Sequence, residues 1–149
     1  MSFQCHIKII SANETYAVRH PMLRQGRPVE DCVFEGDDNL NTLHLGAFIK
    51  NELIGVLSAY QIKHPHLNAN KSYQIRGVAV LTKGHRKGIG SALMTQVEEL
   101  LAKRKVDLIW LNARITALEF YTALAYHREG ESFEIAGIGT HYCFYKTFQ

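Results

Sequence analysis

The stretch that decides the fold runs from residue 78 to residue 93 and reads VAVLTKGHRKGIGSAL. A β-branched segment leads into a turn rich in glycine and basic residues, and apolar residues at helical spacing follow. The first amides of a helix lack partners within it, and the helix dipole favours negative charge there. Gly88 and Gly90 have no Cβ atoms, so an anion can approach their backbone closely. The stretch therefore predicts a strand, an anion-binding turn and a helix.

The same turn carries positive charge but matches neither of two familiar phosphate motifs. Its basic side chains are Lys83, His85, Arg86 and Lys87. A P-loop ends in Gly-Lys-Ser/Thr, whereas Gly90 is followed directly by Ser91. A dinucleotide fingerprint needs a small residue where Leu93 stands. The turn thus predicts an anion-binding site of another kind, and the alternative is a solvated turn whose glycines only cap the helix.

The flanking sequence predicts one mixed α/β domain over residues 1–149, with helices on both faces of the sheet. Apolar and alternating segments predict strands over 5–10, 43–49, 53–62, 73–81, 106–111, 127–135 and 141–148. Helices are expected from a cap at Ser11 or Asn13 to His20, where Pro21 should break or restart the helix, and over 88–104 and 117–125. Residues 24–41 are expected to form a loop with at most a short helix, and residues 64–71 a loop.

Composition excludes several classes of protein. A net charge of +3 over 149 residues is too small to indicate a nucleic-acid-binding face. The three cysteines, Cys5, Cys32 and Cys143, show neither disulfide nor zinc spacing, and His64-Pro65-His66 has no third ligand at motif spacing, so no metal is expected. The sequence has no signal-peptide pattern and no run of membrane-spanning length, which predicts a cytoplasmic protein without membrane partners.

The turn resembles motif A of the GNAT superfamily of N-acetyltransferases. His85-Arg86-Lys87-Gly88-Ile89-Gly90 fills the family frame Arg/Gln-x-x-Gly-x-Gly/Ala, with His at the position that is usually Arg or Gln. Residues 117–126, ALEFYTALAY, are similar to the family segment Ala-x-x-Phe-Tyr-x-x-x-Gly-Phe. Gly36-Asp37-Asp38 with His44, and residues 133–142, are similar to an uncharacterised branch with ElaA-type members.

This resemblance implies a fold, a cofactor and the residues that hold it. The fold is a mixed, mostly antiparallel sheet of about seven strands with helices on both faces and a splay between strands four and five. The cofactor is acetyl-coenzyme A. The strand backbone would hold its pantetheine arm, the turn its pyrophosphate, and two later side chains would complete the contacts. The implied residues are Val78, Ala79, Val80, His85, Arg86, Lys87, Gly88, Ile89, Gly90, Ser91, Arg114 and Tyr121. Arg114 stands where the family often has Asn.

The resemblance also suggests catalytic groups. Tyr121 occupies the position of the family's general acid, and a phenol stays protonated at neutral pH; the alternative is a core aromatic. The general base is open among Glu134, His141, His44 and Asp38, each of which has a purely structural alternative. The acidic loop of Glu35, Asp37 and Asp38 could attract a cationic amine, although such a run is more often only solvated.

The leading hypothesis is an N-acetyltransferase that moves an acetyl group from acetyl-CoA to a primary amine by direct attack in a ternary complex. A non-catalytic acyl-CoA-binding or sensing module on the same scaffold is the alternative, and a nucleotide-binding domain of another class is the third. The acceptor, a small molecule or a peptide, is not readable from any motif. Family members commonly form homodimers, but no segment of this sequence identifies an interface.

Overall fold

The computed structural model describes residues 4–149, which form a seven-stranded sheet with the strand order β1-β2-β3-β4-β5-β7-β6. The ladders β1–β2, β2–β3, β5–β7 and β6–β7 are antiparallel, and the ladder β4–β5 is parallel. The chain divides into two compact units. The first comprises residues up to Tyr60 with Arg76–Leu101, and the second comprises Gln61–Ile75 with Ala102–Gln149. The strand β4 (Ser72–Val80) contributes residues to both units.

The helix α1 (Ala12–Leu23) opens the first unit. Ser11 caps it in a capping box, because its hydroxyl accepts from Glu14 N while the Glu14 carboxylate accepts from Ser11 N. The expected break at Pro21 is wrong, since the helix continues to Leu23. Pro21 lies in the last turn, where its missing N–H removes only one helical hydrogen bond and no long segment follows.

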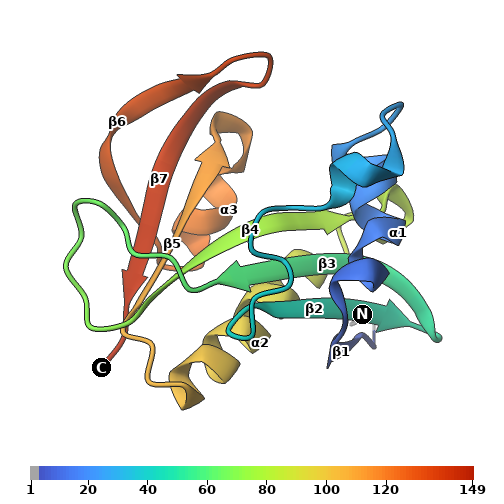
Figure 1. Ribbon diagram of the computed structural model, residues 1–149, viewed down its shortest axis with the longest axis horizontal. Helices are drawn as coiled ribbons and strands as arrows, with labels where there is room; N and C mark the ends of the chain where they lie inside the picture. The colour runs from blue at the N-terminus through green and yellow to red at the C-terminus, as the bar shows by residue number, and fades with distance from the viewer. Residues whose placement is uncertain (1–3) are drawn as a thin grey trace. The chain divides into compact units, whose positions relative to one another are not determined.

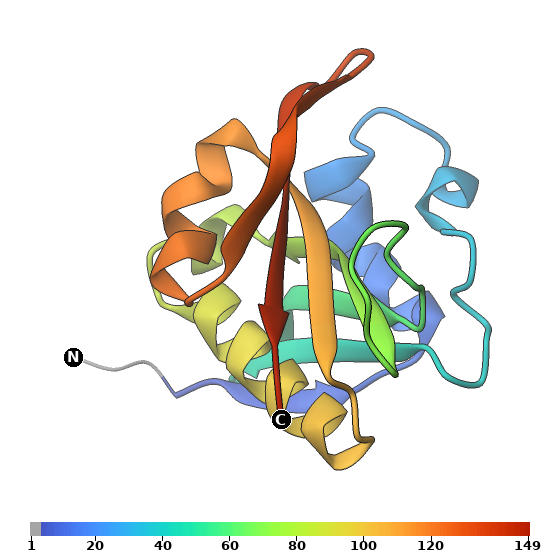
Figure 2. The same cartoon turned by 90° about the vertical axis from the view of Figure 1, so that its left-hand side faces the viewer.

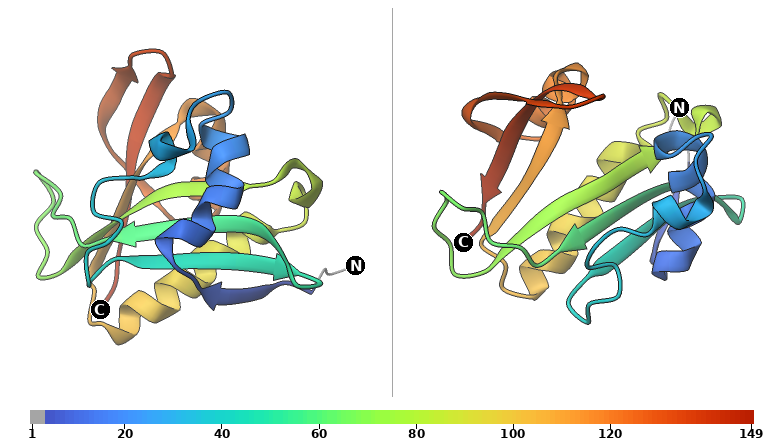
Figure 3. Two further views of the ribbon diagram at one scale, coloured as in Figure 1. Left: turned by 45° about the vertical axis from the view of Figure 1, so that its right-hand side comes forward. Right: turned by 45° about the horizontal axis from the view of Figure 1, so that its top comes forward.

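The rest of the first unit is a sheet between two helices. The strands β1 (His6–Ile9), β2 (Leu43–Ile49) and β3 (Glu52–Tyr60) lie side by side, and Lys50-Asn51, both with positive φ, form the tight hairpin turn (Figure 1). The helices α1 and α2 (Ile89–Lys103) cover opposite faces of these strands (Figure 3). The contacts agree, because Val56 packs in the cluster that contains Val18 of α1, whereas Gly55 faces Ile89 of α2.

The second unit contains the remaining strands and the short helix α3 (Leu118–Ala123). The strand β7 (Gly139–Thr147) runs between β5 (Leu108–Arg114) and β6 (His127–Ile135), as Figure 2 shows. A buried cluster of Leu108, Trp110 and Cys143 forms part of its core.

The predicted order of strands and helices is confirmed, and most observed boundaries lie within three residues of the expected ones. The loop over residues 24–41 contains only the short 3-10 helix η1 (Val29–Cys32). None of the helices within residues 4–149 is long and apolar enough to cross a membrane.

Candidate functional site

The end of strand β4 departs from regular strand geometry where the sequence predicts a ligand-binding backbone. The parallel ladder covers Ser72↔Leu108 to Gln74↔Trp110, although β4 continues to Val80 and β5 to Arg114. Gly77 lies within β4 with φ +65°, a left-handed conformation that interrupts the regular geometry of the strand. A Cβ atom at this position would lie 3.1 Å from the ring of Phe34. Gly77 thus redirects the backbone immediately before Val78–Val80, the predicted pantetheine segment.

The predicted anion-binding turn follows this strand. A 3-10 helix η2 (Thr82–Gly84) leads into four turn residues, and α2 begins at Ile89. Arg86 has φ +63° and Gly88 has φ +73°, so the backbone passes through two left-handed residues before the helix. The amide of Ala92 donates to Gly88 O over 3.0 Å, which closes the first turn of α2.

Two glycines of this segment are required for different reasons. A Cβ on Gly84 would lie 2.3 Å from Cγ2 of Ile54, so the 3-10 helix can pack on β3 only if residue 84 has no side chain. Gly88 has no heavy atom within 4 Å of the Cβ position, apart from its chain neighbours, and is exposed. Packing therefore fixes one end of the turn, while the backbone of Gly88 faces open space in which an anion can approach it.

His85, at the position where the GNAT motif usually has Arg or Gln, is hydrogen-bonded back to the strand. Its Nε2 lies 2.8 Å from Val80 O, and because a carbonyl can only accept, Nε2 carries the proton. Nδ1 is therefore the nitrogen left for other partners. The ring joins the end of β4 to the turn, a role that the sequence did not indicate.

The basic side chains of the turn differ in their partners. Lys83 contacts the carboxylate of Glu52, so its charge is balanced within the first unit. Arg86 is exposed and Lys87 is half-buried. Among these lysine and arginine side chains, Arg86 is therefore the exposed one that makes no ion pair within residues 4–149.

Tyr121 lies in the second unit, on α3, and is 8% exposed. Its ring packs among Phe120, Tyr126 and Phe144, with centroid distances of 4.9, 6.1 and 6.0 Å. Burial raises the pKa of Tyr121 to about 12, because the phenolate would be poorly solvated there. The phenol therefore stays protonated at every physiological pH.

The other predicted residues of the second unit lie at the end of its sheet. Arg114 is the last residue of β5, is exposed, and pairs in register with His141 of β7. His141 is buried, and its Nδ1 donates to Gly139 O over 2.9 Å, which leaves Nε2 as a hydrogen-bond acceptor. Glu134 is exposed on β6 and accepts from the Thr140 hydroxyl over 2.6 Å. Since Glu134 is paired with Thr140, and His141 with Phe133, the two candidate bases lie on opposite faces of the hairpin.

The acidic loop is part of a buried polar network. Asp37 accepts from Arg19 Nη1 over 2.7 Å, from Arg19 Nη2 over 3.1 Å, from Tyr60 Oη over 2.6 Å and from Phe34 N over 2.9 Å. His44 uses both ring nitrogens, with Nδ1 2.6 Å from Ser58 Oγ and Nε2 3.0 Å from Asp37 O. Of the three acids of this loop, Glu35 and Asp38 are exposed and Asp37 is buried. The charge of Asp37 is thus matched by Arg19 rather than offered to a ligand.

Sequence reasoning missed Arg19, Ser58 and Tyr60 of this network. A signal existed for Arg19, because it falls on the same helical stripe as Thr15 and Val18, both fully buried. A charged residue on a buried stripe needs a buried partner of opposite charge.

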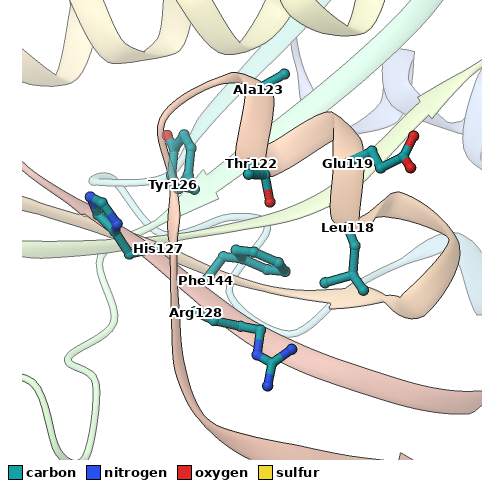
Figure 4. A pocket seen from close by; sticks show the side chains of 8 residues that line it. All are labelled: Leu118, Glu119, Thr122, Ala123, Tyr126, His127, Arg128 and Phe144. Carbon is teal, nitrogen blue, oxygen red and sulfur yellow. The ribbon is translucent and has the colours of Figure 1, made fainter.

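The second unit also has an open cavity of about 620 Å³ beside α3 (Figure 4). Its lining comes from α3 and from β6 and β7: Leu118, Glu119, Thr122, Ala123, Tyr126, His127, Arg128 and Phe144. None of the predicted catalytic or cofactor-binding residues lines it, although two of its lining residues, Tyr126 and Phe144, pack against the ring of Tyr121.

Comparisons with known proteins identify the family of this chain and solved structures that resemble its fold. The family model described as the acetyltransferase (GNAT) family matches residues 9–126. The uncharacterized N-acetyltransferase YitI of Bacillus subtilis is 35% identical over 143 residues, which cover 96% of each chain. An aminoglycoside 6'-N-acetyltransferase complexed with coenzyme A superimposes with a TM-score of 0.75 at 15% identity, covering 95% of this chain and 96% of that one. Escherichia coli ElaA gives 0.73 at 16% identity, covering 96% and 99%. The chain therefore belongs to the acetyltransferase (GNAT) family.

Proposed function

We propose that this acetyltransferase moves an acetyl group from acetyl-CoA to a primary amine by direct attack in a ternary complex. The observation that carries the proposal is the strand–turn–helix of the first unit, in which Gly77 redirects the strand and Gly88 opens the turn. Two of the solved structures that resemble this fold are complexes with coenzyme A.

The residues at the turn fit a diphosphate. The first amides of α2 have no partners within the helix, and the helix dipole favours an anion beside them. Open space in front of Gly88 gives that anion access, and the exposed Arg86 supplies charge. The bond from His85 to Val80 O holds the strand end against the turn, so that pantetheine and pyrophosphate would meet a preformed backbone. The bound cofactor would supply an activated thioester.

Tyr121 is the proposed proton donor. Its phenol keeps its proton, because burial raises its pKa to about 12. A thiol has a pKa of about 8.5 in water, so full transfer from Tyr121 to a thiolate is uphill unless burial raises the thiol pKa as well. A hydrogen bond from Oη to developing negative charge needs no full transfer, and it is strongest in a dry site.

His141 is the proposed base. Its Nδ1 proton is fixed on Gly139 O, so the lone pair of Nε2 is the one that can accept a proton from the acceptor amine, directly or through water. Glu134 is less suited, because its carboxylate is exposed and already accepts from Thr140. His44 uses both ring nitrogens inside the buried network.

The test is Tyr121→Phe, with Tyr126→Phe as the matched control on a second buried tyrosine of the same segment. We expect kcat to fall roughly 100-fold or more in the first variant and little in the second, because one hydrogen-bond donor to developing negative charge typically contributes that much. Calorimetry should give the same dissociation constant for acetyl-CoA in all three proteins.

Two results would contradict the proposal. Absence of any heat with coenzyme A would remove the cofactor site. Binding of acetyl-CoA without release of free thiol, across a broad panel of amines, would instead favour the non-catalytic acyl-CoA-binding module.

A further inference from the structure

Three arginines gather around one phenyl ring in the first unit. Phe34 is 8% exposed, and the guanidinium carbons of Arg19, Arg24 and Arg76 lie 3.9, 4.9 and 5.7 Å from its ring centroid. Such distances are typical of cation–π interactions. One carboxylate, that of Asp37, pairs with this group. The cluster around Phe34 therefore carries excess positive charge.

Two of these arginines are committed to the protein itself. Arg19 is fully buried and donates to Asp37, to Cys32 O, to Ser58 Oγ and to Tyr60 Oη. Arg24 donates to the main-chain carbonyls of Leu23 and Asp31, 2.9 and 3.3 Å away. Neither guanidinium is available as the main anchor of a ligand.

Arg76 is different. Its guanidinium lies over the ring of Tyr60, 5.3 Å from the centroid, as well as near Phe34, and the residue is only half-buried. Across residues 4–149 no carboxylate lies within ion-pair distance of the Arg76 guanidinium, and no acceptor is hydrogen-bonded to it. This includes Glu35 and Asp38, the exposed acids of the nearby loop. Two aromatic rings thus hold the Arg76 guanidinium, and its five N–H donors are unused within the described residues.

The rings that hold Arg76 are themselves fixed. The hydroxyl of Tyr60 donates to Asp37 over 2.6 Å and lies 3.2 Å from Arg19 Nη2, and Phe34 N donates to Asp37 over 2.9 Å. The guanidinium of Arg76 is therefore preorganised, which lowers the entropy lost when it binds an anion.

The position of Arg76 ties it to the proposed reaction. It directly precedes Gly77, the glycine of β4 with positive φ, and stands two residues before the Val78–Val80 backbone that the proposed function assigns to the cofactor. We propose that Arg76 binds an oxyanion group of the acceptor, so that the acceptor is an amine that also carries a carboxylate or a phosphate. This inference rests on the proposed function, because it concerns the acceptor of that same reaction.

The experiment compares acceptors that differ only in the anion. With saturating acetyl-CoA, free thiol is measured for each common amino acid and its carboxamide, for β-alanine and β-alaninamide, and for phosphoethanolamine and ethanolamine. Rates are compared at equal concentrations of neutral amine, because the carboxamides have lower amine pKa values. We expect the best anionic acceptor to exceed its neutral partner by about tenfold or more in kcat/KM, since charge-assisted bidentate bonds are worth that much. The carboxylate and phosphate pairs then show which anion is recognised.

Arg76→Gln should remove this preference. We expect KM for the anionic acceptor to rise roughly 10- to 100-fold, while KM for the neutral partner and the dissociation constant of acetyl-CoA stay within about twofold. Arg76→Lys keeps the positive charge but loses the planar guanidinium group. Its KM for the anionic acceptor should therefore lie between those of the unmodified enzyme and Arg76→Gln. Arg128→Gln is the matched control, because Arg128 also lies over a tyrosine ring, 4.2 Å from the centroid of Tyr142, and it should leave the preference unchanged.

Three outcomes would overturn the inference. Equal rates for anionic and neutral acceptors in the unmodified enzyme would refute it while leaving the transferase intact. Equal loss for both kinds of acceptor in Arg76→Gln and Arg76→Lys would show a purely structural arginine. Acetyl-CoA binding without thiol release from any amine would refute the proposed function, and this inference with it.

Discussion

Replacing Asp37 by Asn should destabilise the protein more than any other isosteric change in the first unit. Asp37 accepts four hydrogen bonds, two of them from Arg19, and both side chains of the pair are nearly inaccessible, at 3% and 0% exposure. The amide of Asn has nearly the same shape as the carboxylate. The variant therefore leaves the charge of Arg19 buried without a counter-ion.

The expected cost follows from that geometry. Breaking a buried ion pair by removing one charge typically costs about 3–5 kcal/mol, against a total stability of about 5–15 kcal/mol. For a chain of this size the melting temperature should fall by roughly 6–20 °C. Asp31→Asn is the matched control, because Asp31 pairs with Arg27 at side-chain exposures of 35% and 58%. Exposed pairs of that kind contribute less than about 1 kcal/mol.

The assay is urea unfolding followed by circular dichroism, at several pH values. Burial alone would raise the pKa of Asp37, but hydrogen bonds from Arg19, Tyr60 and Phe34 N and the charge of Arg19 outweigh it and lower the pKa. The stabilisation by Asp37 is therefore present above its unfolded-state pKa, about 3.9, and is lost as the pH falls through the lower folded-state value. A free energy of unfolding for Asp37→Asn within about 1 kcal/mol of the unmodified protein at pH 7 would refute this reasoning.

Two further predictions concern local packing. Gly84→Ala should lower the free energy of unfolding by about 1–3 kcal/mol, because its Cβ would lie 2.3 Å from Ile54 Cγ2, and it should weaken coenzyme A binding as the turn shifts. An unchanged urea midpoint would contradict the tight packing. Ser11→Ala should cost about 1 kcal/mol through loss of the capping box, seen as a melting temperature roughly 2–4 °C lower; no change would mean that Glu14 alone satisfies the helix end.

The strand, turn and helix over residues 78–93 could be predicted from the sequence because their signals are local. Gly88 and Gly90 at the start of an apolar helical repeat, directly after Val78–Val80, specify a strand, a turn and a helix without reference to the rest of the chain. The mostly antiparallel pairing of about seven strands was predicted only through the family resemblance, and the strand order in the sheet was not predicted at all. Pro21 shows the limit of local rules, because a proline in the last turn of a helix costs too little to end it.

The tertiary structure alone decided which charged side chains remain available to a ligand. Arg19 and Tyr60 are separated by 41 positions, and Arg19 and Asp37 by 18, yet they share one buried network. In that network the carboxylate of Asp37 is paired with Arg19, and both ring nitrogens of His44 have partners. The same packing places Tyr60 and Phe34 beneath Arg76 and leaves its donors unused. The hydrophobic periodicity of the sequence does not predict such pairings. Whether a charge is neutralised depends on neighbours that only the folded chain brings within a few ångströms.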